Sequence, residues 1–301
     1  MKYFLDTEFL EGEQDKRFLG FKTGKKTKQT IELISIGIVA EDGREYYAIS
    51  KDFNLKEAWN RYQIKDNTNN VGYRIGCQHS KIREYWIREN VLKPIWKELT
   101  LKGINDSKYC KNHFGRLGFN YSDFKCLINH YGKTNQQIAE EVKEFVYSKE
   151  DVLYNHEDCR IDNIGEVKSD IEFYAYYADY DWVVFCWLFG KIIDLPGGFP
   201  RYCKDLKEIL DDKVNRLNGK VILHYLEDKT FYGLEPHEDV THTSVPATKT
   251  IYYDKMSFKD KLNFVKNQYY SYPKQQDQHN ALADARWNKK LYEFLMSINE
   301  K

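Results

Sequence analysis

The first ten residues constrain the fold most, because they form an apolar segment that carries two acidic side chains. Residues 3–10 read YFLDTEFL, which predicts a central β-strand. Alternate residues of a strand face the same side, so Asp6 and Glu8 point together, roughly 7 Å apart by strand rise. Like charges repel, and burial adds to the cost. A divalent cation would remove both penalties; the alternative is a half-exposed strand with incidental acids.

A second pattern lies near the other end of the sequence, where residues 279–287 open the last predicted helix. Its apolar stripe, extended back by one turn, reaches Asp284, and a buried aspartate needs a partner. A basic side chain could serve, and so could a metal held by Asp6 and Glu8. His279 lies one turn earlier, where its ring could reach the same site or simply cap the helix. The stripe residues recur at helical spacing: Trp287, Leu291, Leu295 and Ile298.

A third acidic pattern separates an aromatic strand from an apolar helix. Residues 173–177 predict the strand, and residues 182–189 predict a buried helix. Acids suit the first turn of a helix, so Asp179 is the expected cap and Asp181 is expected to face the site. The alternative is that both acids stabilise the helix start and have no chemical role.

Together these patterns resemble the DEDDh exonucleases of the ribonuclease H-like superfamily. The resemblance rests on residues 6–8, on Tyr180-Asp181 before an apolar helix, and on the His-x4-Asp spacing from His279 to Asp284. The sequence is more closely similar to the polyadenylate-specific exoribonuclease family of mycobacteria (RNase AS-like). That likeness covers about half of the chain, in five stretches: 3–9, 30–48, 178–190, 200–210 and 279–286.

The resemblance implies a metal-dependent 3′-5′ exoribonuclease that shortens single-stranded RNA, including adenylate-rich 3′ ends, to nucleoside 5′-monophosphates. The implied site holds two ions of Mg²⁺ or Mn²⁺, because carboxylate oxygens suit hard cations. Asp6 would bridge both ions, Glu8 and Asp284 would hold the ion that activates water, and Asp181 would bind the second. His279 would take the proton from the attacking water. A 3′-5′ DNA exonuclease is the alternative, and a homodimer is common among relatives.

Composition fits an enzyme of the cytoplasm and argues against a protein that binds nucleic acid through its overall charge. Lysine plus arginine number 46, as do aspartate plus glutamate, so the net charge is zero. The 24 tyrosines could stack on bases, although most are expected in the core. No apolar run is long enough to span a membrane, and no export signal is visible at the N-terminus.

Six cysteines are expected to be free thiols, because no export signal is visible. Some pairs have a spacing that could contribute to a structural zinc site, but no C-x2-C motif occurs. The pairs are Cys77 with His79, Cys110 with His113, Cys126 with His130, and His156 with Cys159.

The expected fold is α/β, a ribonuclease H-like mixed sheet flanked by helices, in a single domain over residues 1–301 with several insertions. Insertions are expected near 12–29, 100–131, 149–170 and 212–276, the first as a basic hairpin or loop. Strands are expected at 2–10, 31–40 and 44–50, with further strands at 219–226 and 248–253. Helices are expected at 80–92 (ended by Pro94), from a cap at Asn135, at 201–210 and at 257–268.

Overall fold

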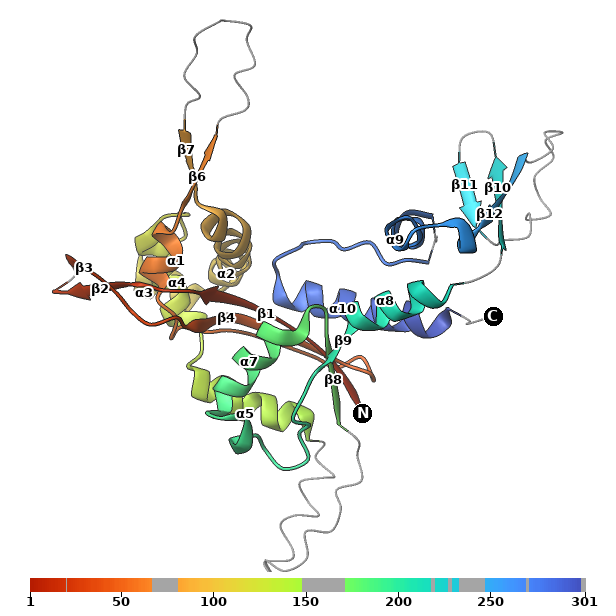
Figure 1. Ribbon diagram of the computed structural model, residues 1–301. Coiled ribbons are helices and arrows are strands. Elements are labelled where there is room, and N and C mark those ends of the chain that lie inside the picture. The colour runs from red at the N-terminus through yellow and green to blue at the C-terminus, as the bar shows by residue number, and fades with distance from the viewer. Residues whose placement is uncertain are drawn as a thin grey trace, which may run out of the picture.

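A five-stranded mixed sheet forms the centre of the computed structural model (Figure 1). The structure describes residues 1–19, 21–66, 81–147, 171–217, 220–226, 229–232, 247–268 and 271–298. The strand order is β5-β4-β1-β8-β9. Strand β4 is antiparallel to β1, and β5 is antiparallel to β4, whereas β8 runs parallel to β1 and β9 runs parallel to β8. This is the expected ribonuclease H-like α/β sheet. Its strands are β1 (Lys2–Glu11), β4 (Ile31–Ala40), β5 (Glu45–Ile49), β8 (Glu172–Ala175) and β9 (Lys204–Asp205).

Helices cover both faces of this sheet. Helices α5 (Asn135–Val146) and α7 (Ala178–Phe189) pack on one face, against Tyr3, Leu5 and Phe173. Helices α8 (Leu206–Arg216) and α10 (Ala281–Ser297) cover the other face, against Phe4 and Val39. The alternation of apolar residues along β1 therefore feeds two separate cores, and Asp6 and Glu8 share the α10 face with Phe4.

A third core lies beyond the far end of β1, where a group of helices surrounds Leu10 and Ile34. No helix was predicted over 100–131, where an insertion was expected, yet most of this segment is helical. Its glycines and asparagines obscure the helical spacing of its buried residues. The helices of this group are α1 (Leu55–Asn60), a π-helical turn η1 (Arg88–Leu92), α2 (Lys93–Asn105), α3 (Ser107–His113) and α4 (Tyr121–Tyr131).

The predicted helix over 80–92 is also only partly right. Residues 81–84 form strand β7 (Lys81–Glu84), which pairs with β6 (Gln63–Asp66), and residue 80 lies outside the described residues. Pro94 does not end the helix as expected, because it lies in the first turn of α2 directly after η1. The wider π-helical turn makes room for the proline ring, so the chain continues as a helix to Asn105.

The remaining elements agree more closely with expectation. The basic segment 12–29 forms a hairpin of β2 (Asp15–Phe18) and β3 (Phe21–Lys26). Strands β10 (Lys220–Leu226), β11 (Lys229–Tyr232) and β12 (Ala247–Tyr252) form a small sheet, followed by α9 (Phe258–Gln268). Helix α5 is capped by Thr134 and not by Asn135, and the expected insertion at 149–170 lies outside the described residues. No described helix is both long and apolar enough to cross a membrane.

The contact between α10 and the sheet is unusually close at Gly37 of β4, the residue paired with Asp6. A Cβ atom at Gly37 would lie 2.3 Å from the carbonyl oxygen of Ala281 and 2.5 Å from the Cα atom of Leu282. Both neighbours are backbone atoms, so a side chain at residue 37 would push the start of α10 away from the sheet. Glycine at this position therefore sets how near the helix lies to Asp6.

We predict that Gly37→Ala destabilises the protein, because the new methyl group overpacks the helix–sheet contact. The melting temperature should fall by roughly 2–10 °C, as measured by circular dichroism. Gly197→Ala is the matched control, since a Cβ there meets nothing within 4 Å. Equal melting temperatures for both variants would contradict the proposed role of Gly37.

Candidate active site

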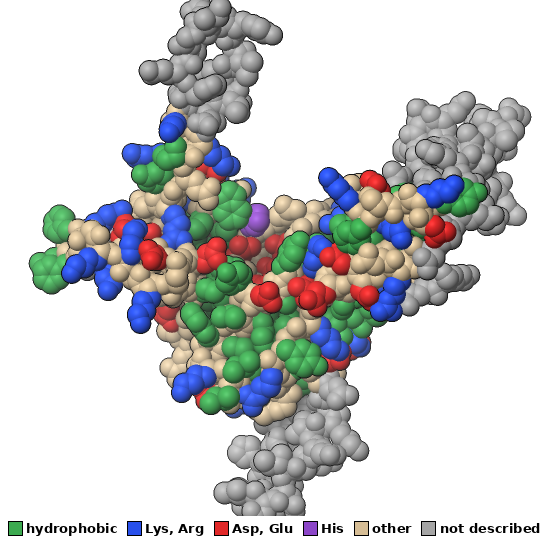
Figure 2. All heavy atoms as spheres, viewed as in Figure 1, with side chains coloured by type: hydrophobic (Ala, Val, Ile, Leu, Met, Phe, Trp, Pro, Cys, Tyr) green, Lys and Arg blue, Asp and Glu red, His purple; other side chains and the backbone are tan. Residues whose placement is uncertain are grey.

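A pocket of about 390 Å³ opens where β1, the start of α7 and the start of α10 meet. Figure 2 shows acidic side chains gathered in a hollow in this face of the molecule. All five residues predicted from the sequence line the pocket: Asp6, Glu8, Asp181, His279 and Asp284. Aromatic side chains complete its wall: Phe9, Tyr176, Tyr177, Tyr180 and Trp287.

Three of the carboxylates come together closely. Asp6, Glu8 and Asp284 each offer an oxygen, and these atoms lie within 4.8 Å of one another. Asp6 and Glu8 come from the same face of β1, and Asp284 comes from the first turn of α10, where its side chain is only 6% exposed. Residues that are 276 or more positions apart in the sequence thus meet in one group.

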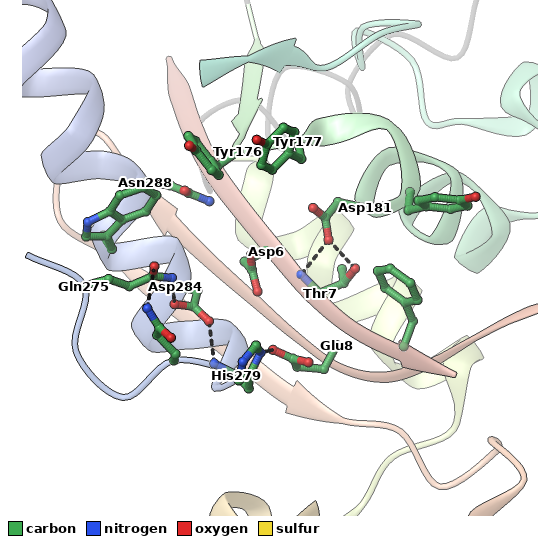
Figure 3. A pocket seen from close by; sticks show the side chains of 14 residues that line it. Asp6, Thr7, Glu8, Tyr176, Tyr177, Asp181, Gln275, His279, Asp284 and Asn288 are labelled. Carbon is green, nitrogen blue, oxygen red and sulfur yellow. Dashed lines mark hydrogen bonds and ion pairs between the residues drawn. The ribbon is translucent and has the colours of Figure 1, made fainter. Parts of the chain in front are cut away.

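Asp181 lies beside this group and is held by Thr7, the residue between Asp6 and Glu8. The backbone N–H of Thr7 donates to Oδ1 of Asp181 at 2.9 Å, and the Thr7 hydroxyl donates to the same oxygen (Figure 3). The side chain of Thr7 faces away from those of Asp6 and Glu8, toward α7. The three consecutive residues of β1 therefore connect with both helices that carry the other acids.

His279 lies at the pocket rim, directly before α10. Its Nδ1 atom is 3.8 Å from Oε1 of Glu8, and its backbone N–H donates to Oδ2 of Asp284 at 2.9 Å. The residue has a left-handed backbone, with φ at 67°, and its ring meets the ring of Trp86 edge to face at 4.8 Å. These contacts hold the imidazole next to the acids, with 39% of the side chain exposed.

Burial raises the pKa values of all four acids and is the main cause for each. Neighbouring carboxylates raise the pKa values of Asp6, Glu8 and Asp181 further, whereas hydrogen bonds from Gln275 and His279 oppose the rise at Asp284. The pKa of Glu8 rises to about 8 and that of Asp181 to about 7, although hydrogen bonds from Thr7 oppose the latter shift. The pKa of Asp6 lies well above its ordinary value, and that of Asp284 is also raised. The folded protein therefore holds these charges together only at a cost.

The donor set fits a hard divalent cation. Among the described residues, no donor hydrogen-bonds the carboxylate of Asp6, although it faces three other acids. Carboxylate oxygens are the ligands that Mg²⁺ and Mn²⁺ prefer, and no thiol lines this pocket. A cation coordinated by Asp6, Glu8 and Asp284 would replace the missing donor and reduce the repulsion.

A zinc site built from cysteine and histidine pairs finds no support in the part of the chain that the structure describes. The three acids are its only group of three or more potential ligands. Cys110 and Cys126 are free thiols, as are Cys186 and Cys203. The pairs of Cys77 with His79 and of His156 with Cys159 lie outside the described residues.

Asp205 orients the start of α7 and was missed from the sequence. The predicted cap, Asp179, lies inside the first turn, and the N-cap is Tyr177, whose backbone is left-handed with φ at 58°. The carboxylate of Asp205 accepts the backbone N–H groups of Tyr177 at 3.2 Å and Ala178 at 3.3 Å. It also caps α8, so one side chain fixes two helix starts and, through α7, the position of Asp181.

Asn288 was also missed, and it ties α10 to the strand that carries Asp6. This side chain is 1% exposed, and its amide donates to the carbonyl oxygen of Leu5 at 2.8 Å. It lies one turn after Asp284 on the same helix face. An asparagine on an apolar helix face is a visible signal in the sequence, because a buried amide needs a partner. Gln275, which donates to Asp284, gives no such signal, because it lies in a loop.

Comparison with known proteins points to one activity. No protein-family model matches the chain. Over 213 residues, the chain is 26% identical to two 3′-5′ exoribonucleases of Mycobacterium tuberculosis, one from strain CDC 1551 / Oshkosh and one from strain ATCC 25618 / H37Rv. The match covers 71% of this chain and 76% of each relative.

We predict that the metal-free protein loses stability as pH rises. The folded state keeps protons on Glu8 and Asp181 up to about pH 8 and 7, whereas the unfolded chain releases them near the ordinary pKa values of 4.5 and 3.8. Their contribution is therefore fully present below about pH 4 and is lost as pH rises through about 7 to 8. Melting temperatures measured in chelator across this range should fall, and Mg²⁺ or Mn²⁺ should restore them at the alkaline end.

The same repulsion predicts that Asp6→Asn stabilises the metal-free protein at alkaline pH. The amide keeps the shape of the side chain and removes one charge, so the melting temperature in chelator should rise by at least ~2 °C. Glu144→Gln, at an exposed position of α5, is the control and should leave it unchanged. A drop in the melting temperature of Asp6→Asn would contradict the repulsion argument.

Proposed function

We propose that this chain is a metal-dependent 3′-5′ exoribonuclease that hydrolyses single-stranded RNA from its 3′ end to nucleoside 5′-monophosphates. One observation carries the proposal: Asp6, Glu8 and Asp284 offer oxygens within 4.8 Å of one another, with His279 beside them. An acid cluster next to an imidazole suits hydrolysis of a phosphodiester. The two mycobacterial relatives support the direction of attack and the RNA substrate.

The four acids would hold two ions of Mg²⁺ or Mn²⁺. Asp6 is central, because its charge interacts with those of Glu8, Asp181 and Asp284. Such ions supply positive charge to the scissile phosphate and make bound water more acidic. Asp181 is already hydrogen-bonded to Thr7, so its free oxygen would complete the binding of one ion or its water.

His279 would act as general base. Its ring is partly exposed at the pocket rim, within 3.8 Å of Glu8, so it can reach a water molecule above the acids. The hydrogen bond from its backbone to Asp284 and the contact with Trp86 limit how far the ring can move. Proton transfer from that water would leave the charge on an exposed imidazole, from which solvent can remove it.

The pocket walls suit the last base of a single strand. Phe9 and Tyr180 form a ring pair with centroids 5.8 Å apart, and Tyr180 is 52% exposed. Tyr177, at 62% exposed, lies on the same wall. Aromatic rings stack on any base, so the walls alone select no sequence. An adenylate-rich 3′ end is the natural substrate that we propose, and it rests on the family resemblance.

The experiment that tests this function uses 5′-labelled single-stranded RNA, including poly(A), with single-stranded DNA as the comparison. Mg²⁺ or Mn²⁺ should support stepwise shortening from the 3′ end of RNA, and chelator should abolish it. Internal cuts, or cleavage that chelator does not affect, would refute the mechanism. Preferential shortening of DNA would favour the alternative DNA exonuclease.

We further predict that Asp181→Asn and Asp179→Asn differ sharply. Asp181 is 6% exposed in the pocket, whereas Asp179 is exposed in the same helix turn and does not line the pocket. Asp181→Asn should lower kcat at least ~100-fold, because the metal ion or its bound water would lose the negative charge of this carboxylate. Asp179→Asn should remain within about twofold of the unchanged protein. Initial rates on labelled RNA measure both, and comparable losses would show that Asp181 has no special role.

A further inference from the structure

A cluster of arginine and aromatic side chains lies next to the pocket, and apart from Trp86, which contacts His279, it takes no part in the chemistry described above. It is built from the end of α1, the paired strands β6 and β7, and residues 85–88 at the start of η1. We call it the arginine–aromatic surface, and it comprises Trp59, Tyr62, Arg83, Tyr85, Trp86 and Arg88.

Its side chains alternate rings with guanidinium groups. The guanidinium of Arg83 lies 4.8 Å from the centroid of the Tyr62 ring, and that of Arg88 lies 3.9 Å from the centroid of the Tyr85 ring. The rings of Tyr62 and Tyr85 meet at 5.7 Å, and Arg88 also approaches the Trp59 ring at 5.5 Å. These contacts hold the rings and the charges in a fixed order along the surface.

Much of this apolar material is open to solvent. Tyr62 is 45% exposed and Trp86 is 38% exposed, and their neighbours on the hairpin, Ile64 and Ile82, are 54% and 46% exposed. Exposed rings of this size would gain free energy from a partner that covers them. Arg83 is exposed as well, and it forms no ion pair within the described ranges.

The surface is continuous with the pocket through Trp86. The ring of Trp86 meets that of His279 at 4.8 Å, so the surface begins at the candidate general base. In Figure 2, hydrophobic and basic side chains lie together beside the acidic hollow, where β6 and β7 emerge in Figure 1. Arg83 lies on β7, three residues before Trp86 in the sequence, and so on the strand that leads away from the pocket.

The charge of the surface is opposite to that of the pocket. In the segments 59–66 and 81–93, basic residues outnumber the acids Asp66, Glu84 and Glu89. The basic residues are Arg61, Lys65, Lys81, Arg83, Arg88 and Lys93. A polyanion that entered the acidic pocket unaided would be repelled, and a basic approach offsets that repulsion.

We propose that the arginine–aromatic surface binds the single-stranded RNA upstream of the nucleotide in the pocket. The inference rests on the proposed function and extends it to the path of the substrate. Bases stack on exposed rings without regard to sequence, and guanidinium groups contact the phosphates between them. Trp86 receives the base next to the pocket, and Tyr62 with Arg83 binds the strand farther along.

The test compares a dinucleotide with a single-stranded RNA of more than ~16 nucleotides, which is the upper size of the site that one OB fold covers on a single strand. Affinity for the long RNA is measured by fluorescence anisotropy in chelator, so that no hydrolysis occurs, and dinucleotide hydrolysis is measured with Mn²⁺. The variants are Tyr62→Ala and Arg83→Gln, which lie away from His279. Tyr62→Phe is the conservative variant, and Lys143→Glu on α5 is the control for charge elsewhere.

We expect Tyr62→Ala to weaken binding of the long RNA roughly tenfold and Tyr62→Phe to retain it, because the ring carries the contact. Arg83→Gln should weaken binding and lower the slope of log affinity against log salt by about 0.7, the value for one phosphate contact. Dinucleotide hydrolysis should be unchanged in these variants.

Two outcomes would refute different statements. Unchanged affinity and salt slope in both Tyr62→Ala and Arg83→Gln would overturn the RNA-binding role of this surface and leave the exonuclease intact. Failure of the unchanged chain to hydrolyse the dinucleotide and to shorten the long RNA would instead refute the proposed function.

Discussion

Repulsion among buried carboxylates is the constraint on which the rest of the structure depends. Asp6, Glu8, Asp181 and Asp284 share one pocket, where burial raises the pKa of each and neighbouring carboxylates raise those of Asp6, Glu8 and Asp181 further. If repulsion were the only force on them, these carboxylates would move apart. The surrounding fold must therefore hold three elements together against a local force that drives them apart, and a cation would relieve that force.

The structure resists the repulsion with backbone contacts and with few polar side chains. Gly37 lets the start of α10 lie directly on β4, and Asn288 ties the same helix to the carbonyl oxygen of Leu5. On the opposite face, Thr7 holds Asp181, and Asp205 caps the helix that carries it. Three of these four residues are uncharged, so they position the acids without adding charge to the pocket, whereas the carboxylate of Asp205 adds to the repulsion on Asp181.

Much of this arrangement could be predicted from local pattern, and the reasons for the misses are physical. Strand β4 is apolar over nearly its whole length, β1 is rich in apolar residues around its two acids, and Asp284 continues the buried stripe of α10, so each is visible in a short window of sequence. Asp205 acts on α7, a helix other than the one it caps. Helix α8 begins five residues later than the predicted 201, and Tyr202, which was expected in its buried stripe, is 64% exposed. No role was predicted for Thr7, which lies between two acids. Such roles depend on which element lies opposite, and no local window contains that information.

The bond from Asn288 to Leu5 joins residues 283 positions apart, and this has a consequence for biosynthesis. Ribosomes add about 5–20 residues per second, so β1 emerges many seconds before α10 follows. During that interval Asp6 and Glu8 lack Asp284 and His279, so the proposed site is incomplete. If the proposed function holds, the nascent chain would become able to hydrolyse RNA only after α10 has emerged from the ribosome.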